Sequence, residues 1–155
     1  MANIEKSGET AHVTIAGAIT ELADFTKVKA LKGAARIDLS GIERINSLGV
    51  RNWSMFVRDA EAGGLAMTFE RCSPVIVEQI AMISNFLGTR SRVASLLVPY
   101  FCEACSTEHT QLIERAPTAP IVVPPVNSCP KCGQPAAVDE PENMYAALSK
   151  SLAGR

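Results

Sequence analysis

The chain has little net charge and no long hydrophobic run. Its 15 Lys and Arg residues are balanced by 16 Asp and Glu residues, which gives a formal charge of −1 at pH 7. This balance argues against a nucleic-acid binder that relies on a basic surface. No apolar stretch approaches the roughly 20 residues of a membrane span, and the first residues lack the pattern of a signal peptide. We therefore expect a cytoplasmic protein that does not associate with membranes, in which paired cysteines hold metal more often than they form disulfides.

Signatures of common enzyme classes are also missing from the sequence. There is no Walker-type phosphate loop, no Gly-x-Ser-x-Gly motif and no His-Glu-x-x-His motif. The acidic residues show no paired arrangement suited to general acid–base catalysis. The sequence therefore predicts that the protein is not an enzyme and has no catalytic residues.

Cysteine is scarce, but four of the five cysteines form two Cys-x-x-Cys pairs. Cys102 and Cys105 make the first pair, and Cys129 and Cys132 make the second after a spacer of 23 residues. Two such pairs can place four thiolates around one tetrahedral metal ion. This closed site leaves no position for a catalytic water, so we expect a structural metal. Zinc is the predicted ion, and iron is the alternative because Cys-Pro-Lys-Cys-Gly is also a knuckle used for a single iron.

The fifth cysteine and one histidine need separate interpretations. Cys72 lies near a predicted strand end and is interpreted as a small buried apolar residue, with a reactive thiol as the alternative. His109 could replace one cysteine as a metal ligand, but four cysteines already suffice. We therefore expect His109 to be an ordinary surface or strand residue.

Apolar patterning predicts strands and helices in alternation. Strands are expected at residues 11–19, 35–39, 65–69 and 93–98. Helices are expected at residues 21–31 and 48–62, and a third is expected to begin at Ser73 and Pro74 and to end at Gly88. Leu22, Phe25 and Val28 share one face of the first helix, and Trp53 lies on the apolar face of the second. Further on, residues 111–114 and 121–123 are expected as strands, and a short helix follows Pro141.

This order of elements predicts an α/β fold, in which helices cover a sheet. The expected organisation has three parts. Residues 1–98 form the α/β domain, residues 99–137 form a zinc-ribbon-like module with the four cysteines, and residues 138–155 form a short helix and tail.

Two short motifs lie within residues 35–49. Asp38-Leu39-Ser40-Gly41 ends a predicted strand, and Asn46-Ser47-Leu48-Gly49 begins a predicted helix. In order and spacing they resemble the STAS domain, the fold of bacterial anti-sigma-factor antagonists, whose second motif is Asp-Ser-Ser/Thr-Gly. The resemblance covers roughly residues 5–98 and implies a mixed sheet with packed helices. In the second motif, Asn46 replaces the aspartate and Leu48 replaces the second serine or threonine.

The resemblance also implies a site and partners. In the STAS family, a partner kinase that is itself an anti-sigma factor phosphorylates the first serine of the second motif. The unphosphorylated form binds this kinase and thereby releases a sigma factor. By position, Ser47 is the implied phospho-acceptor. The candidate partner-binding residues are Asn46, Ser47, Leu48, Gly49 and Arg51, and for Arg51, expected to be exposed next to Ser47, simple solvation is the alternative.

The residues themselves allow a second interpretation of Ser47. A serine just before a helix can cap a free N–H of the first turn, and Asn46 could supply the cap instead. A phosphate on Ser47 would face the positive end of the helix dipole. It would add a charge of about −1.5 to −2 to the surface.

The expected function is therefore a non-catalytic signalling module that binds a protein partner through the helix start at Ser47. One alternative is a zinc-ribbon adaptor for nucleic acid or the transcription machinery, which the acidic Glu103, Glu108 and Glu114 near the cysteines disfavour. Another alternative is a STAS-type sensor of a small ligand.

Overall fold

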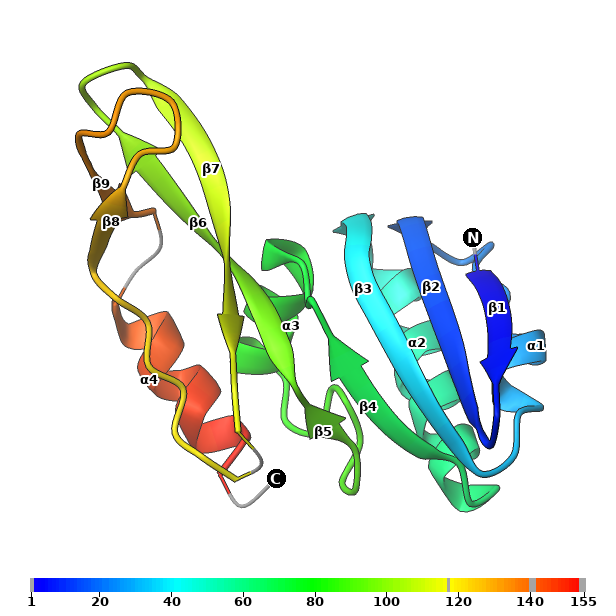
Figure 1. Ribbon diagram of the computed structural model, residues 1–155. Coiled ribbons are helices and arrows are strands. Elements are labelled where there is room, and N and C mark those ends of the chain that lie inside the picture. Colours follow the sequence, from blue (N-terminus) through cyan, green and yellow to red (C-terminus); the bar gives the residue numbers. More distant parts are fainter. Residues whose placement is uncertain (1, 117, 140–141, 154–155) are drawn as a thin grey trace.

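The computed structural model describes residues 2–116, 118–139 and 142–153, and the described residues form an α/β fold with two sheets (Figure 1). The strands are β1 (Ala2–Ser7), β2 (Thr10–Ile19), β3 (Ala34–Ile45), β4 (Ala66–Glu70), β5 (Arg92–Val93), β6 (Ser95–Cys102), β7 (Thr107–Glu114), β8 (Val126–Ser128) and β9 (Pro135–Val138). The helices are α1 (Thr26–Lys29), α2 (Ser47–Ala62), α3 (Pro74–Met82) and α4 (Glu142–Ser151). Within this described part of the chain, none of the helices has the length and apolar character needed to cross a bilayer.

The first sheet, here called sheet A, has the strand order β1-β2-β3-β4-β5. β1 runs antiparallel to β2, and the other neighbouring strands are parallel. Val13, Ile37 and Phe69 are register partners on β2, β3 and β4, and all three are buried on the face that α2 covers (Figure 1). The opposite face carries polar side chains, including the ion pair of Arg36 with Glu70. The alternation of apolar and polar residues thus gives a sheet covered by helices on one side.

The second sheet, sheet B, is antiparallel and has the order β7-β6-β9-β8. It contains two hairpins, β6 with β7 and β8 with β9, which lie side by side because β6 pairs with β9. The helix α4 packs against α3 below sheet B (Figure 1). Leu148 of α4 and Leu152, which follows the helix, are both buried.

The two sheets share one hydrophobic core. Buried side chains from sheet A, the helices and sheet B belong to a single cluster, and Cys72 forms a parallel bridge with Leu96 of β6. The boundary expected between residues 98 and 99 falls inside β6. Both parts of the chain are therefore packed on each other rather than joined by a linker.

An aromatic group centred on Trp53 fills the space between α2 and sheet A. The ring of Trp53 stacks on Phe86 with centroids 5.7 Å apart, and it meets Phe25 edge-on at 5.6 Å. Its Nε1–H donates to the Phe86 carbonyl oxygen over 2.9 Å. The prediction that Trp53 packs in the core is confirmed, since the residue is fully buried.

The helix predicted at residues 21–31 is much shorter in the structure, where α1 spans only Thr26–Lys29. The Thr20 hydroxyl accepts a hydrogen bond from the Leu22 N–H, and the Asp24 carboxylate accepts one from the Thr26 N–H. Such local side-chain bonds favour turns over a helix. Leu22, which the periodicity placed on the apolar face, is 86% exposed.

Other boundaries also differ from the predictions. β3 continues past Ser40 and Gly41 to Ile45, because Gly41 has no side chain and can approach Ala16 of β2, which a Cβ would meet at 2.7 Å. The third helix ends at Met82 rather than at Gly88. β1 was not predicted, and residues 121–123 do not form a strand. The strand expected at 111–114 is part of β7, and α4 follows position 141, which lies outside the described residues.

Candidate functional site

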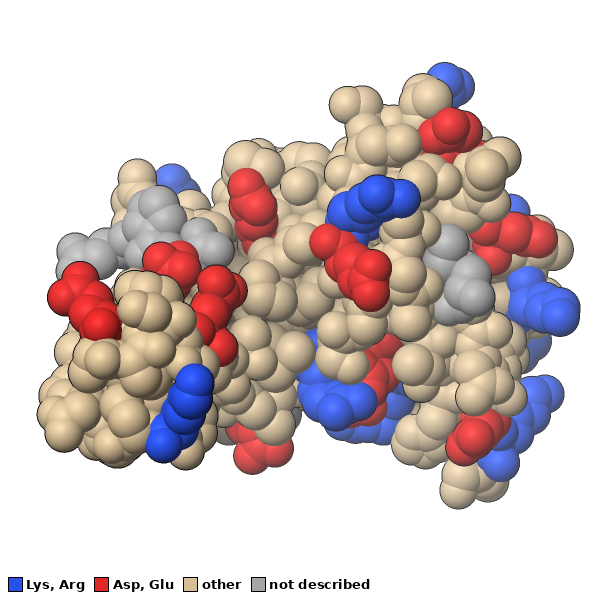
Figure 2. All heavy atoms as spheres, turned by 90° about the horizontal axis from the view of Figure 1, so that it is seen from above, with Lys and Arg blue, Asp and Glu red and all other residues tan. Residues whose placement is uncertain are grey.

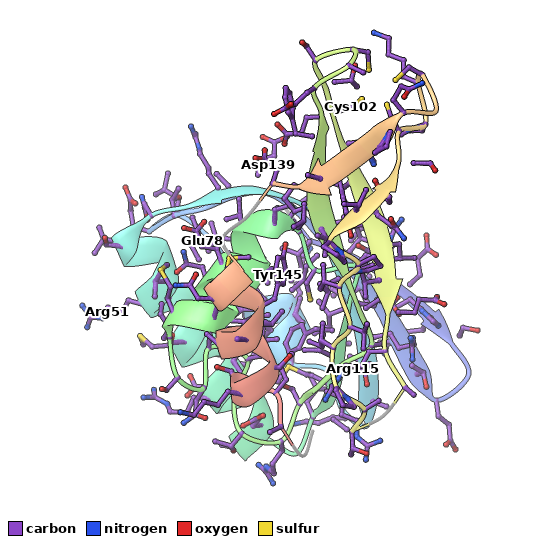
Figure 3. The ribbon with its side chains drawn as sticks, turned by 90° about the vertical axis from the view of Figure 1, so that its left-hand side faces the viewer. Arg51, Glu78, Cys102, Arg115, Asp139 and Tyr145 are labelled. Atoms are coloured by element: carbon purple, nitrogen blue, oxygen red, sulfur yellow. The ribbon has the colours of Figure 1, made fainter. Side chains whose placement is uncertain are left out.

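The four predicted metal ligands meet at the tips of the two hairpins of sheet B. Cys102 is the last residue of β6, and a four-residue turn brings Cys105 back towards it before β7 begins. Cys129 and Cys132 lie in the turn between β8 and β9, where Gly133 adopts a φ of +76° and donates its N–H to the Cys129 carbonyl over 2.9 Å. Figure 3 shows Cys102 at this end of the sheet.

The sulfur atoms have the spacing of a tetrahedral thiolate site. The Sγ atoms of Cys102 and Cys132 are 3.5 Å apart, those of Cys105 and Cys129 are 3.6 Å apart, and all four ligand atoms lie within 4.8 Å of one another. A tetrahedral zinc with Zn–S bonds of about 2.3 Å requires S–S separations of about 3.8 Å. The four cysteines are therefore positioned to hold a metal ion.

The local electrostatics also fit a cation. The N–H of Cys132, together with that of Lys131, lowers the pKa of the Cys129 thiol to about 6. For Cys132, the N–H of Gln134 lowers the pKa, but desolvation and the neighbouring cysteine sulfurs outweigh it and raise the pKa to about 12. Four sulfurs at this spacing cannot all ionise without a positive charge between them, and a divalent metal supplies that charge.

Cys72 and His109 lie outside this cluster. Cys72 is fully buried, and burial raises the pKa of its thiol to about 12. This agrees with the interpretation of Cys72 as an inert packing residue. His109 lies in β7, where its ring stacks on Tyr100 and its Nε2 is 3.2 Å from the Asn127 side-chain oxygen.

A second candidate site surrounds the start of α2. Asn46 is the N-cap, and its Oδ1 accepts a hydrogen bond from the Gly49 N–H over 2.7 Å. Of the two capping interpretations, the one with Asn46 is therefore confirmed. Ser47 is the first residue of the helix and is exposed. Gly49 is buried and lies so close to β2 that a Cβ would stand 2.0 Å from the Ile19 carbonyl oxygen, so this position requires glycine.

Glu21 belongs to this second site, although no sequence motif points to it. Its carboxylate accepts a hydrogen bond from Nδ2 of Asn46 over 3.1 Å. The Asn52 side chain donates to the backbone oxygens of Thr20 and Glu21, which fixes the turn over the helix. Backbone and Asn46 hydrogen bonds hold the pKa of Glu21 below its ordinary value. No short motif signals this contact, because Glu21 and Asn46 lie 25 positions apart in the chain.

Exposed apolar side chains accompany these polar groups. Leu22 follows Glu21, Leu48 is 53% exposed, and Met55 lies two helical turns after Leu48 on the same side of α2. Arg51 is exposed as well and projects away from the rest of the molecule (Figure 3). We call this set the helix-start surface. It comprises Glu21, Leu22, Asn46, Ser47, Leu48, Arg51 and Met55.

The structure thus brings together the four predicted metal ligands in one place and the residues around Ser47 in another. The two sites lie at different ends of the molecule, with the cysteines in sheet B and Ser47 beside sheet A (Figure 1). The cysteine geometry alone does not select one metal among those that bind thiolates. Comparison of the chain with protein-family models, with curated proteins and with solved structures finds no match.

Proposed function

We propose that this protein is a non-catalytic signalling module of the anti-sigma-factor antagonist type, and that it binds a protein partner through the helix-start surface. The observation that carries the proposal is the exposure of Leu22, Leu48 and Met55 around Ser47. Clustered exposed apolar residues with a polar surround are typical of protein-binding surfaces. The partner implied by the STAS resemblance is a kinase that also acts as an anti-sigma factor.

We further propose that Ser47 is the phosphorylated residue of this surface. Ser47 is exposed at the first turn of α2, where a phosphate would lie near the positive end of the helix dipole. Arg51 follows it by four residues, a spacing that allows a pair between phosphate and guanidinium. The Glu21 carboxylate, bonded to Asn46, supplies an acidic group beside the acceptor in place of the aspartate that STAS proteins carry.

A phosphate on Ser47 would change the surface in two ways. It would add a charge of about −1.5 to −2 next to the exposed Leu48, and it would repel the carboxylate of Glu21. Both effects oppose docking of an apolar partner surface. We therefore expect the unphosphorylated form to bind the partner more tightly.

For the metal centre we propose a structural zinc ribbon. Cys102, Cys105, Cys129 and Cys132 would hold the ion, and its charge would offset the repulsion among the four thiolates. The sheet strands that carry the ligands form two hairpins joined by a long segment, so the metal would tie their tips together. Metal analysis of the protein from its natural host tests the assignment. One zinc per chain supports it, and iron in its place contradicts it.

The first experiment is native mass spectrometry of the protein purified from its natural host, because one mass reports both metal and phosphate. A phosphate adduct that disappears in Ser47→Ala supports phosphorylation at Ser47. A chain that carries metal but no phosphate under every growth condition contradicts phosphorylation at Ser47.

Partner binding is tested by crosslinking in the same host. We expect Leu48→Glu and Ser47→Asp to reduce capture of a kinase that the wild-type protein captures. Val122→Glu is the matched control, because Val122 is an exposed apolar residue in the segment between β7 and β8. Equal capture by all of these variants would contradict the proposed surface.

A further inference from the structure

One face of sheet B is apolar and exposed near the metal centre. Directly paired residues on neighbouring strands point to the same face of a sheet. Glu108, Phe101, Ala137 and Val126 are paired in this way across β7, β6, β9 and β8. Phe101 is 36% exposed, Val126 is 53% exposed, and Ala137 is also exposed. The residues of the adjacent row, such as Tyr100, point to the buried face.

This row lies in a shallow groove of about 420 Å³. Phe101, Val126 and residues 135–138 line it, and the acidic Glu103 and Asp139 stand at its edges. Glu108 lies at the β7 end of the row. We call this feature the acidic groove. Figure 2 shows acidic side chains gathered over this end of the molecule, at the left of the view.

The charges of the acidic groove determine what can cover it. Glu103, Glu108 and Asp139 are all exposed, and none belongs to an ion pair found among the described residues. Two copies of the groove facing each other would bring like charges together, which is unfavourable. A covering surface should therefore combine basic groups with apolar side chains.

The chain carries such a surface on α2. Leu48, Arg51, Met55 and Arg58 follow one another at spacings of three, four and three residues, so they form one stripe along the helix. All four are exposed, and the stripe is opposite the buried side that contains Trp53. Arg58 contacts Asp59 at 3.4 Å, an exposed pair of little energetic weight. We call this set the basic stripe.

We propose that the acidic groove of one molecule binds the basic stripe of a second copy of this chain. The two surfaces lie on different halves of the molecule, α2 beside sheet A and the groove on sheet B (Figure 1). Such a contact is head-to-tail, so a dimer still presents one free groove and one free stripe, to which further copies can bind. The near-zero net charge leaves little overall repulsion against association.

The contact involves one helix face and one small groove, so it is a weak interface with a dissociation constant on the order of 10–100 μM. Because the basic stripe shares Leu48, Arg51 and Met55 with the helix-start surface, one stripe cannot bind a second copy and the protein partner at the same time. The inference does not rest on the proposed function, since it needs neither a kinase nor a phosphate on Ser47.

Sedimentation velocity of the metal-loaded full chain tests the proposal, at protein concentrations from about 10 to about 500 μM. We expect the wild-type protein to form dimers and longer species as concentration rises, and added salt to weaken them. The double variant Arg51→Gln/Arg58→Gln removes the positive charges of the basic stripe, and Glu108→Gln/Asp139→Asn removes two of the three negative charges of the acidic groove. Each should raise the dissociation constant by about tenfold or more.

The decisive measurement is sedimentation of a mixture of the two double variants. The first retains an intact groove and the second retains an intact stripe, so the mixture should form one-to-one heterodimers and no longer species. Lys6→Gln and Glu5→Gln are matched charge controls on β1, where both side chains are exposed, and they should associate like the wild type.

Three results would overturn the proposal. The first is a wild-type protein that stays monomeric over the whole concentration range, which would leave the groove to a different protein. The second is association that survives in both double variants, which would indicate a different interface. The third is a mixture that fails to form heterodimers although each variant is folded by circular dichroism.

Discussion

Removing one ligand from each hairpin of the metal centre should destabilise the whole protein. Cys105→Ser/Cys132→Ser is the appropriate variant, because Cys105 is only half-buried and Cys132 is exposed, so the change leaves no cavity in the core. A metal held by the four cysteines would link Cys105 to Cys129 and close the chain segment between them. Loop-closure entropy for the roughly 25 residues of this segment corresponds to about 3.5 kcal/mol.

This loss of free energy lowers the melting temperature, Tm. In a protein of this size, 1 kcal/mol shifts Tm by about 2–4 °C, so the variant should melt about 7–14 °C below the metal-loaded wild type. Calorimetry of the wild type before and after chelation provides the measurement. Chelation should lower the wild-type Tm by a similar amount and should leave the Tm of the variant unchanged, because the variant has no metal to lose.

Ser128→Ala is the control for this experiment, since Ser128 is exposed beside Cys129 but outside the sulfur cluster. It should bind metal and melt like the wild type. The reasoning is refuted if mass spectrometry shows that the metal has left while Tm falls by less than about 2 °C. That result would mean that the hairpin tips unfold independently of the shared core.

Three further substitutions test how the fold holds its sites. Trp53→Phe removes the hydrogen bond to the buried Phe86 carbonyl and should cost about 2–4 kcal/mol in urea unfolding. Gly49→Ala brings a Cβ within 2.0 Å of the Ile19 oxygen, so the start of α2 must move, and we expect a loss of about 2–4 kcal/mol; an unchanged free energy of unfolding would contradict the close approach. Glu61→Gln should cost about 1.5–3 kcal/mol at pH 7. Burial raises the pKa of the Glu61 carboxyl, but hydrogen bonds from three backbone N–H groups lower it by more, so the folded-state pKa lies below the ordinary 4.5. The ionised carboxylate therefore stabilises the fold fully above that value and loses this effect as the pH falls through the lower folded-state pKa, so the difference between wild type and variant should shrink below pH 4.5.

Short-range sequence patterns predicted the elements that depend on residues close together in the chain. The buried side of α2 follows from the spacing of its apolar residues, and the tetrahedral cluster follows from two Cys-x-x-Cys pairs, which constrain their own geometry. The extended strand β3 was underestimated because Ser40 and Gly41 are typical of a strand end, whereas Gly41 here allows close approach to Ala16.

Contacts between distant residues were not predictable in the same way. Glu21 reaches Asn46 only after β2 and β3 are paired, and Leu22 is exposed because local hydrogen bonds replace the helix that its spacing suggested. Likewise, the groove beside Phe101 exists only because β6 pairs with β9, a register that depends on the meeting of two hairpins. Such features depend on tertiary packing, which short-range periodicity does not encode.

The strand β6 restricts how this chain could have been assembled in evolution. Its first half pairs with Cys72 and joins the common core, while its second half carries Cys102 to the cluster of four cysteines. Recombination at residue 98 would divide the strand and expose apolar side chains in both products. A relative without the cysteine hairpins would therefore need other side chains in place of Leu96 and Val98. Gain or loss of these hairpins should thus coincide with changes in the residues that pack against α3.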